Sequence, residues 1–274
     1  MEFDSGTLVL LVLLMLGTGV VAGLLAGLLG VGGGIVIVPI LFLLFDGLDV
    51  AESLAMHVAV ATSLATIVPT SIASALAHLR KGNLDVALLR EWAPFIGVGA
   101  ALGGLLAGSL GGAQLKLVFG IVALLVAMNM ASPKQPVLGE RLPGSGAARG
   151  GIAGGIGVFS ALMGIGGGTL SVPLLSMYSV PTHRAVGTAA AFGLVIAVPA
   201  VIGFVWSGLD VAGRPPGSLG YVNLIAACLI FPVTTVFAPI GARIAHALPA
   251  ERLRRVFALF LAVTAVRMLW TALT

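Results

Sequence analysis

The chain has 274 residues, of which 59% are hydrophobic and only 9% are charged. A soluble domain carries about 25% charged residues, so this chain lacks the polar side chains needed to cover a globule in water. The formal charge is +4, but Lys and Arg do not cluster with aromatic residues, which argues against nucleic-acid binding. The composition predicts an all-α polytopic protein of the plasma membrane, which in bacteria is the inner membrane.

Ten apolar stretches follow one another along the chain, and several approach or exceed the roughly 20 residues that cross a bilayer as a helix. The first follows an acidic start without the basic region of a signal peptide, so we expect it to be retained. The lone Cys228 excludes an intrachain disulfide. The expected helical stretches are 7–29, 35–45, 54–77, 91–110, 115–131, 151–163, 169–178, 183–206, 221–247 and 253–273.

A glycine-rich motif occurs twice and precedes the two shortest stretches. Gly30–Gly34 is followed by Pro39, and Gly164–Gly168 is followed by Pro173 at the same offset. Consecutive glycines are poor helix formers, each costing about 1 kcal/mol relative to Ala. Each motif therefore predicts a break between two helical pieces inside the membrane.

The motif belongs to a longer repeat with a period near 134 residues. We expect a first repeat over 1–131, a cytoplasmic linker rich in Pro and Gly over 132–149, and a second repeat over 150–274. Each repeat would supply four transmembrane segments, about eight in all, with the first segment of each broken at the glycines. Matching loops carry opposite Lys and Arg biases, so the positive-inside rule predicts that the repeats are inverted.

The glycine motifs are candidate anion sites. Glycine leaves backbone N–H groups unshielded, and the helix that follows each break points the positive end of its dipole at the same place. Inverted repeats with broken helices are typical of secondary transporters. Close helix packing is the alternative explanation for the glycines. The candidate binding residues here are Gly32, Gly33, Gly34, Gly166, Gly167 and Gly168.

Hydroxyl side chains provide a second set of candidates. Thr62, Thr66, Thr70, Ser74 and His78 follow one another at four-residue spacing and would form a polar stripe on one helix face. The stripe could line a cavity, or its hydroxyls could simply bond carbonyls of their own helix. The hydroxyl residues that we select as substrate-binding candidates are Thr62, Ser63, Thr66, Thr169, Ser171 and Thr188.

Three further residues are candidates for coupling or gating. His57 and His183 occupy equivalent repeat positions, and histidine titrates near neutral pH. Arg243 could attract a cytoplasmic anion. The alternatives are polar caps at the membrane interface for the histidines and a snorkelling side chain for the arginine.

At these motifs the chain resembles the sulfite exporter TauE/SafE family. The resemblance rests on Leu29–Gly34 with Pro39, Ala59–Ser63, Gly164–Gly168 with Pro173, and His183–Thr188. It implies export of small sulfur-containing anions, such as sulfite or organosulfonates, across the plasma membrane. One departure is Ala189, where the family commonly has a serine, while Ser63 keeps a hydroxyl at the equivalent place.

Two alternatives to a secondary transporter stay open. A passive anion channel or a carrier of another small organic anion would use the same cavity. A membrane-embedded enzyme is disfavoured because the acidic residues lie in loops or at segment ends, and no His-Glu-x-x-His motif occurs. We expect no cofactor and no metal, a small anionic substrate as the partner, and possible homodimers through glycine-lined helix faces.

Overall fold

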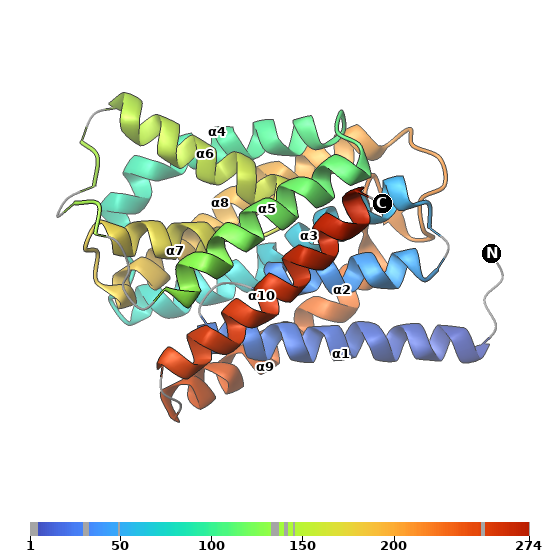
Figure 1. The fold of residues 1–274 in the computed structure, drawn as a ribbon, viewed down its shortest axis with the longest axis horizontal. Helices are drawn as coiled ribbons and strands as arrows, with labels where there is room; N and C mark the ends of the chain where they lie inside the picture. The colour runs from blue at the N-terminus through green and yellow to red at the C-terminus, as the bar shows by residue number, and fades with distance from the viewer. Residues whose placement is uncertain are drawn as a thin grey trace.

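The computed structural model describes residues 5–29, 33–48, 50–132, 137–139, 142–144, 146–247 and 250–273. Within this part of the chain, ten α-helices and one two-stranded hairpin form a helical bundle (Figure 1). The helices are α1 (Ser5–Leu29), α2 (Gly34–Asp46), α3 (Glu52–Arg80), α4 (Val86–Ala107), α5 (Gly112–Ala131), α6 (Gly146–Met163), α7 (Gly167–Met177), α8 (Thr182–Gly208), α9 (Leu224–Ala247) and α10 (Ala250–Leu273). The strands are β1 (Ser218–Leu219) and β2 (Val222–Asn223).

Each expected apolar stretch is a helix, which confirms an all-helical polytopic membrane protein. Seven of the described helices are long and apolar enough to cross a bilayer, namely α1, α3, α4, α5, α8, α9 and α10. The helix α2 is too short to cross, and α7 is shorter still. The expected count of eight segments, in which each broken pair counts as one, is not confirmed by this criterion of length and composition. The helix α6 begins at Gly146, so the last residues of the expected linker are helical.

The two broken helices turn back on themselves. In Figure 1, α1 runs from the right along the lower edge of the bundle, and α2 returns toward the end where α1 began. The helices α6 and α7 make the same excursion from the opposite end of the bundle. We call the two ends the Glu52 end and the Lys81 end, after residues at the two ends of α3.

Hydrogen bonds and ion pairs identify which helix termini lie at the same end of the bundle. At the Glu52 end, the ammonium of Lys116 on α5 pairs with Glu52 and donates to the carbonyl of Thr271 at 2.8 Å. This ammonium also lies 5.4 Å from the centre of the Phe42 ring. At the Lys81 end, the guanidinium of Arg149 lies 3.1 Å from the carboxylate of Glu91.

Most of the close helix pairs join a helix of the first half of the chain to a helix of the second half. The helix α1 packs on α9, and α4 packs on α6, while α3 lies against α8 and α5 against α10. Glycines let these helices approach closely. A methyl group on Gly99 would lie 2.1 Å from the carbonyl oxygen of Gly154, and one on Gly241 would lie 2.1 Å from that of Leu24.

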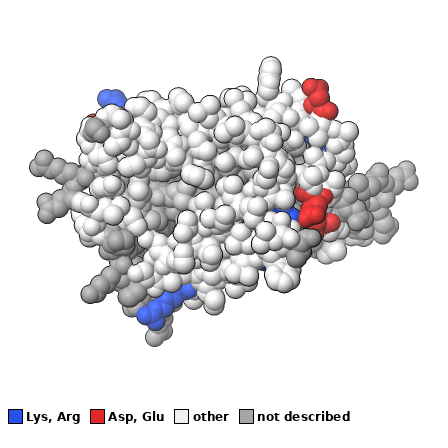
Figure 2. Space-filling view, turned by 45° about the horizontal axis from the view of Figure 1, so that its top comes forward, with Lys and Arg blue, Asp and Glu red and all other residues white. Residues whose placement is uncertain are grey.

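Charged side chains divide between the two ends. Figure 2 shows acidic side chains at one end of the bundle and most of the visible basic ones toward the other. The described basic residues at the Lys81 end are Arg80, Lys81, Arg90, Arg149, Arg184, Arg243 and Arg255, against the acidic residues Asp85 and Glu91. A Lys and Arg excess of this kind is typical of the cytoplasmic side.

Candidate substrate-binding cavity

The two glycine breaks meet inside the bundle. A methyl group on Gly34 would lie 2.5 Å from the carbonyl oxygen of Gly164 and 3.0 Å from the Cα atom of Ile165. The end of α6 explains its break. Gly164 has a φ of 69°, a conformation that favours glycine, and Ile165 N donates to the Ser160 carbonyl at 3.0 Å. This is the arrangement of a Schellman motif.

Both short helices begin at the breaks with their N-termini uncapped by side chains. Gly33 is the N-cap of α2 and Gly166 is the N-cap of α7, and neither can supply a side-chain hydrogen bond. The first N–H groups of a helix have no partner within that helix. Two helix N-termini therefore converge with donors that a ligand could use.

A cavity of about 650 Å³ joins both breaks. Gly33 and Gly166–Gly168 form part of its wall, and α3 contributes a row of residues that leads toward the Lys81 end. The row consists of Thr66, Ile67, Thr70, Ser71, Ala73, Ser74, Ala77 and His78, followed by Lys81. The remaining wall comes from Ile37 of α2 and from α1, α8 and α9, including Thr234 and Thr235. The expected polar stripe therefore faces a cavity.

The charge of the cavity wall suits an anion. Lys81 belongs to the wall, and none of the described residues that line it is acidic. The positive ends of the α2 and α7 dipoles add to the same potential. The hydroxyls, however, are already engaged with their own helix: Thr66 Oγ1 donates to Ser63 O at 2.7 Å, and Thr70 Oγ1 donates to Thr66 O at 2.9 Å.

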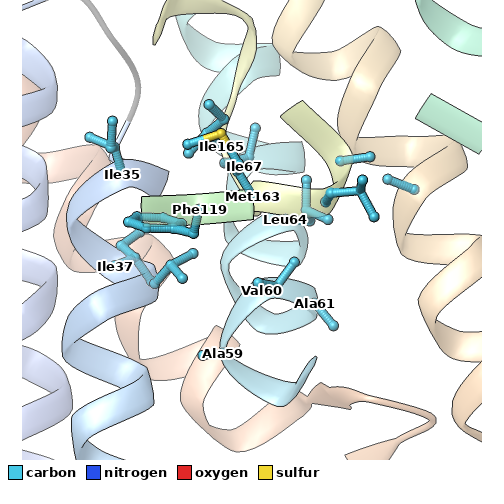
Figure 3. Close-up of a cluster of buried hydrophobic side chains, with 14 of the residues drawn as sticks. Ile35, Ile37, Ala59, Val60, Ala61, Leu64, Ile67, Phe119, Met163 and Ile165 are labelled. Carbon is cyan, nitrogen blue, oxygen red and sulfur yellow. The ribbon is translucent and has the colours of Figure 1, made fainter. Parts of the chain in front are cut away.

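An apolar cluster borders the cavity toward the Glu52 end. Ile37 and Ile67 belong both to the cavity wall and to the buried core. Figure 3 shows them with Leu64 of α3 and with Phe119 of α5. The exposed fraction of each of these side chains is 3% or less. The cavity therefore extends from the breaks toward the Lys81 end alone.

The predicted glycines and hydroxyls divide into two groups. The cavity wall includes Gly33, Gly166, Gly167, Gly168 and Thr66. Gly34 is buried directly behind the wall, against Gly164. Gly32 lies outside the described residues. The remaining predicted residues do not line the cavity: Thr62, Ser63, Thr169, Ser171 and Thr188 are fully buried.

Thr62 and Thr188 hold the start of a neighbouring helix. Thr188 Oγ1 accepts from Asp85 N at 3.0 Å, and Thr62 Oγ1 accepts from Asn223 N at 2.9 Å. Asp85 in turn caps α4, and Asn223 caps α9 by accepting from Ala226 N at 2.9 Å. Each threonine thus anchors the start of a helix that belongs to the other half of the chain.

Ser63 ties α3 to the second glycine break. Its hydroxyl donates to the carbonyl oxygen of Gly164 at 2.7 Å. Thr169 and Ser171 belong to the start of α7, where their exposed fractions are 1% and 0%. The hydroxyl of Ser63 therefore supports the backbone next to the cavity.

The three coupling candidates lie in different surroundings. His57 is 3% exposed. Its Nδ1 lies 2.8 Å from Ser53 O, and its Nε2 lies 2.9 Å from Ala107 O. The ring stacks on Tyr221 at 4.7 Å, and burial raises the pKa of this tyrosine.

His57 is therefore a link between the start of α3 and the end of α4. His183 is exposed at the start of α8. Arg243 is exposed on α9, four residues beyond Pro239 of the cavity wall.

Several wall residues were not among the predicted site residues. Thr234 and Thr235 carry no repeat counterpart that would single them out, and Thr234 Oγ1 donates to Ile230 O at 2.9 Å like an ordinary helical threonine. Lys81 also belongs to the wall. Its position just after the polar stripe of α3 was the available signal.

A multi-pass bundle whose broken helices enclose a polar cavity is the architecture of a membrane transporter. The family model described as sulfite exporter TauE/SafE matches residues 15–268, so the chain belongs to the TauE/SafE family. The names of its relatives point to a transporter rather than an enzyme.

Three relatives illustrate this similarity. The chain is 38% identical to a probable membrane transporter protein of Haemophilus influenzae, over 94% of this chain and 97% of the relative. It is 27% identical to one of Methanocaldococcus jannaschii, over 98% of both chains. It is 29% identical to one of Bacillus subtilis, over 62% of this chain and 69% of the relative. Comparison with solved structures gave no significant match.

Proposed function

We propose that the chain is a secondary transporter that exports small sulfur-containing anions, such as sulfite or organosulfonates. The observation that carries the proposal is the cavity at the two glycine breaks, with helix N-termini, Lys81 and His78 around it and no acidic residue among the described lining residues. The volume of about 650 Å³ is within the usual range for small-molecule sites. The sulfur chemistry of the substrate is taken from the family description.

In this proposal the anion binds at the N-termini of α2 and α7. The first-turn N–H groups beside Gly33 and Gly167 donate to its oxygen atoms, as helix N-termini commonly do for sulfate and phosphate. The hydroxyl of Thr66 can rotate from its backbone acceptor to the anion, since hydrogen bonds to charged acceptors are stronger. Lys81 attracts the anion from the Lys81 end.

We further propose that the halves 1–131 and 150–274 are inverted repeats joined by the segment 132–149. The helix contacts support this symmetry. The first helix of the first half, α1, packs on α9 of the second half, and the first helix of the second half, α6, packs on α4 of the first half. The bonds from Thr62 and Thr188 to the residues that cap α9 and α4 support it too. An alignment of the two repeats pairs Asn83-Leu84-Asp85 with Gly208-Leu209-Asp210. The hydrogen bonds instead favour Asn223 as the counterpart of Asp85, since β1 and β2 are inserted after α8.

The direction of the cavity supports transport by alternating access. The excess of Lys and Arg favours a cytoplasmic Lys81 end, so the cavity would be open to the cytoplasm in this conformation. The apolar cluster around Leu64 and Phe119 would close the opposite route. This closure favours a transporter over an open anion channel. Proton antiport or the inside-negative membrane potential would drive the anion outward.

Liposomes loaded with candidate anions provide the test. Purified protein should release sulfite or a sulfonate such as sulfoacetate with saturable kinetics, and it should discriminate against acetate. Sulfate and taurine complete the panel, since they vary charge and size around the same sulfur chemistry. Absence of protein-dependent flux for every sulfur anion would contradict the proposal. A flux that rises linearly with concentration would favour a channel.

A further inference from the structure

Two buried serines of the second half have hydroxyls that lack hydrogen-bond partners. Ser160 on α6 and Ser171 on α7 each have an exposed fraction of 0%. Neither Oγ has a partner among the described residues. Leaving a buried hydroxyl unpartnered is destabilising, and each such group in a native structure requires an explanation. A second conformation in which both hydroxyls find partners would provide one.

The repeat relates both serines to the wall of the cavity. Gly33 and Gly167 are 134 residues apart, since 167 − 33 = 134, and the same offset pairs Ala26 with Ser160 and Ile37 with Ser171. Ala26 and Ile37 both line the cavity. The serines therefore occupy, in the second half, the positions that face the open cavity in the first half.

The helix α3 lines the cavity at positions where its counterpart α8 is closely packed. Ser74 and Ala77 of α3 line the cavity. Their counterparts, at the offset of 126 that pairs His57 with His183, are Ala200 and Gly203 of α8. These are packed against α4, since a methyl group on Gly104 would lie 2.7 Å from the carbonyl oxygen of Ala200. The second half is thus closed at the positions where the first half is open.

The glycine breaks differ as well. A methyl group on Gly33 would meet its nearest neighbour, the carbonyl oxygen of Ala22, at 3.4 Å. One on Gly167 would lie 2.4 Å from the carbonyl oxygen of Ala189. Two related halves in different states of opening are what alternating access between inverted repeats requires.

We propose that a second cavity opens at the Glu52 end when α4 and α8 separate, and that Ser160 and Ser171 are its polar lining. In that state their hydroxyls bind water or donate to the transported anion. The inference rests on the proposed function. It also accounts for an asymmetry of the repeats: the α8 counterparts of Thr66 and Thr70 are the apolar Phe192 and Ile196, so the polar groups of this route come from α6 and α7.

Cysteine accessibility tests the inference in the full-length protein. In a Cys228→Ser background, Ser160→Cys and Ser171→Cys are each treated with a membrane-impermeant, cationic methanethiosulfonate. The reagent is applied to right-side-out and to inside-out vesicles. Ala153→Cys is the matched control, because Ala153 is also 0% exposed on α6, and its counterpart Gly19 packs against α9. Ser74→Cys reports the cavity that is already open.

The cysteines at Ser160 and Ser171 should react from the side of the Glu52 end alone, and the Ser74→Cys variant should react from the opposite side. A minor state populated at about 0.1–10% would slow their reaction about 10- to 1,000-fold relative to an exposed cysteine. The Ala153→Cys control should not react. Transport of sulfite by each variant is measured in parallel.

The outcomes separate the two proposals. If transport is normal but both cysteines stay unreactive from the Glu52 side, or react from the Lys81 side, the second cavity is wrong and the proposed function stands. If both react from the Glu52 side while no sulfur anion is transported, the second cavity holds and the substrate is wrong.

Discussion

Substitution of Gly167 by alanine should destabilise the protein through a clash with α8. The added Cβ would lie 2.4 Å from the carbonyl oxygen of Ala189 and 2.8 Å from the backbone N of Gly193. Ordinary contacts begin near 3.4 Å, so the overlap with Ala189 is 3.4 − 2.4 = 1.0 Å. The neighbours are backbone atoms, which cannot rotate away. Overpacking of this kind costs about 1–3 kcal/mol, which corresponds to a fall in Tm of about 2–12 °C.

Substitution of Gly33 by alanine is the matched control. Its added Cβ would meet Ala22 O and the side chain of Ile37 at 3.4 Å, without overlap. The Tm of this variant in detergent should therefore stay close to that of the native chain. Its methyl group would nevertheless cover backbone N–H groups at the cavity wall. Anion efflux from liposomes, normalised to folded protein, should fall.

Thermal unfolding in detergent and efflux from liposomes together distinguish packing from binding. Equal Tm values for the Gly33→Ala and Gly167→Ala variants would refute the close approach of α7 to α8. Native efflux from folded Gly33→Ala protein would refute the role of the first break in the site. The two results are independent, so each refutes one step of the reasoning.

Four further substitutions should have distinct effects. Glu52→Ala should cost about 1–3 kcal/mol, because it removes the counter-charge of the buried Lys116 ammonium, but from a carboxylate that is 61% exposed and screened by water. Lys116→Met should cost less, and the reverse order of Tm values would contradict this. Lys81→Gln should raise the half-saturating anion concentration about two- to fivefold, an effect that should shrink at high salt. His57→Ala should lower the free energy of unfolding by about 1–3 kcal/mol, because the bonds of the ring to α4 are lost. Efflux per folded molecule should persist. A loss of efflux would instead favour a coupling role for His57.

The sequence predicted the helices well because their signals are local. Apolar stretches separated by Gly, Pro and charged residues mark each helix, and the two glycine motifs mark both breaks. The hairpin of β1 and β2 was not predicted, since Ser218–Asn223 lacks the alternation of a strand. In the proposed repeat, its consequence is that Asn223 matches Asp85, since both residues cap a helix and donate their backbone N–H to a threonine of the other half.

The candidate site was predicted only in part, because hydroxyl residues look alike in a sequence. Thr66 lines the cavity, whereas Thr62, on the same predicted stripe, bonds to Asn223. That bond joins residues 161 positions apart, so no local pattern can reveal it. Thr234 and Thr235 were missed for the converse reason: only the packing of α9 against α1 and α3 brings them to the cavity.

The packing of first-half helices on second-half helices also has a consequence for biosynthesis. The helix α1 packs chiefly on α9, which begins at Leu224, and much less on α2 of its own half. It therefore enters the membrane long before its main neighbour has been translated. Gly19 and Gly23 on its contact face then face lipid or an insertion chaperone until α9 arrives. A nascent chain that stops before α9 should consequently leave this face of α1 without its partner helix, even though all residues of the first half are present.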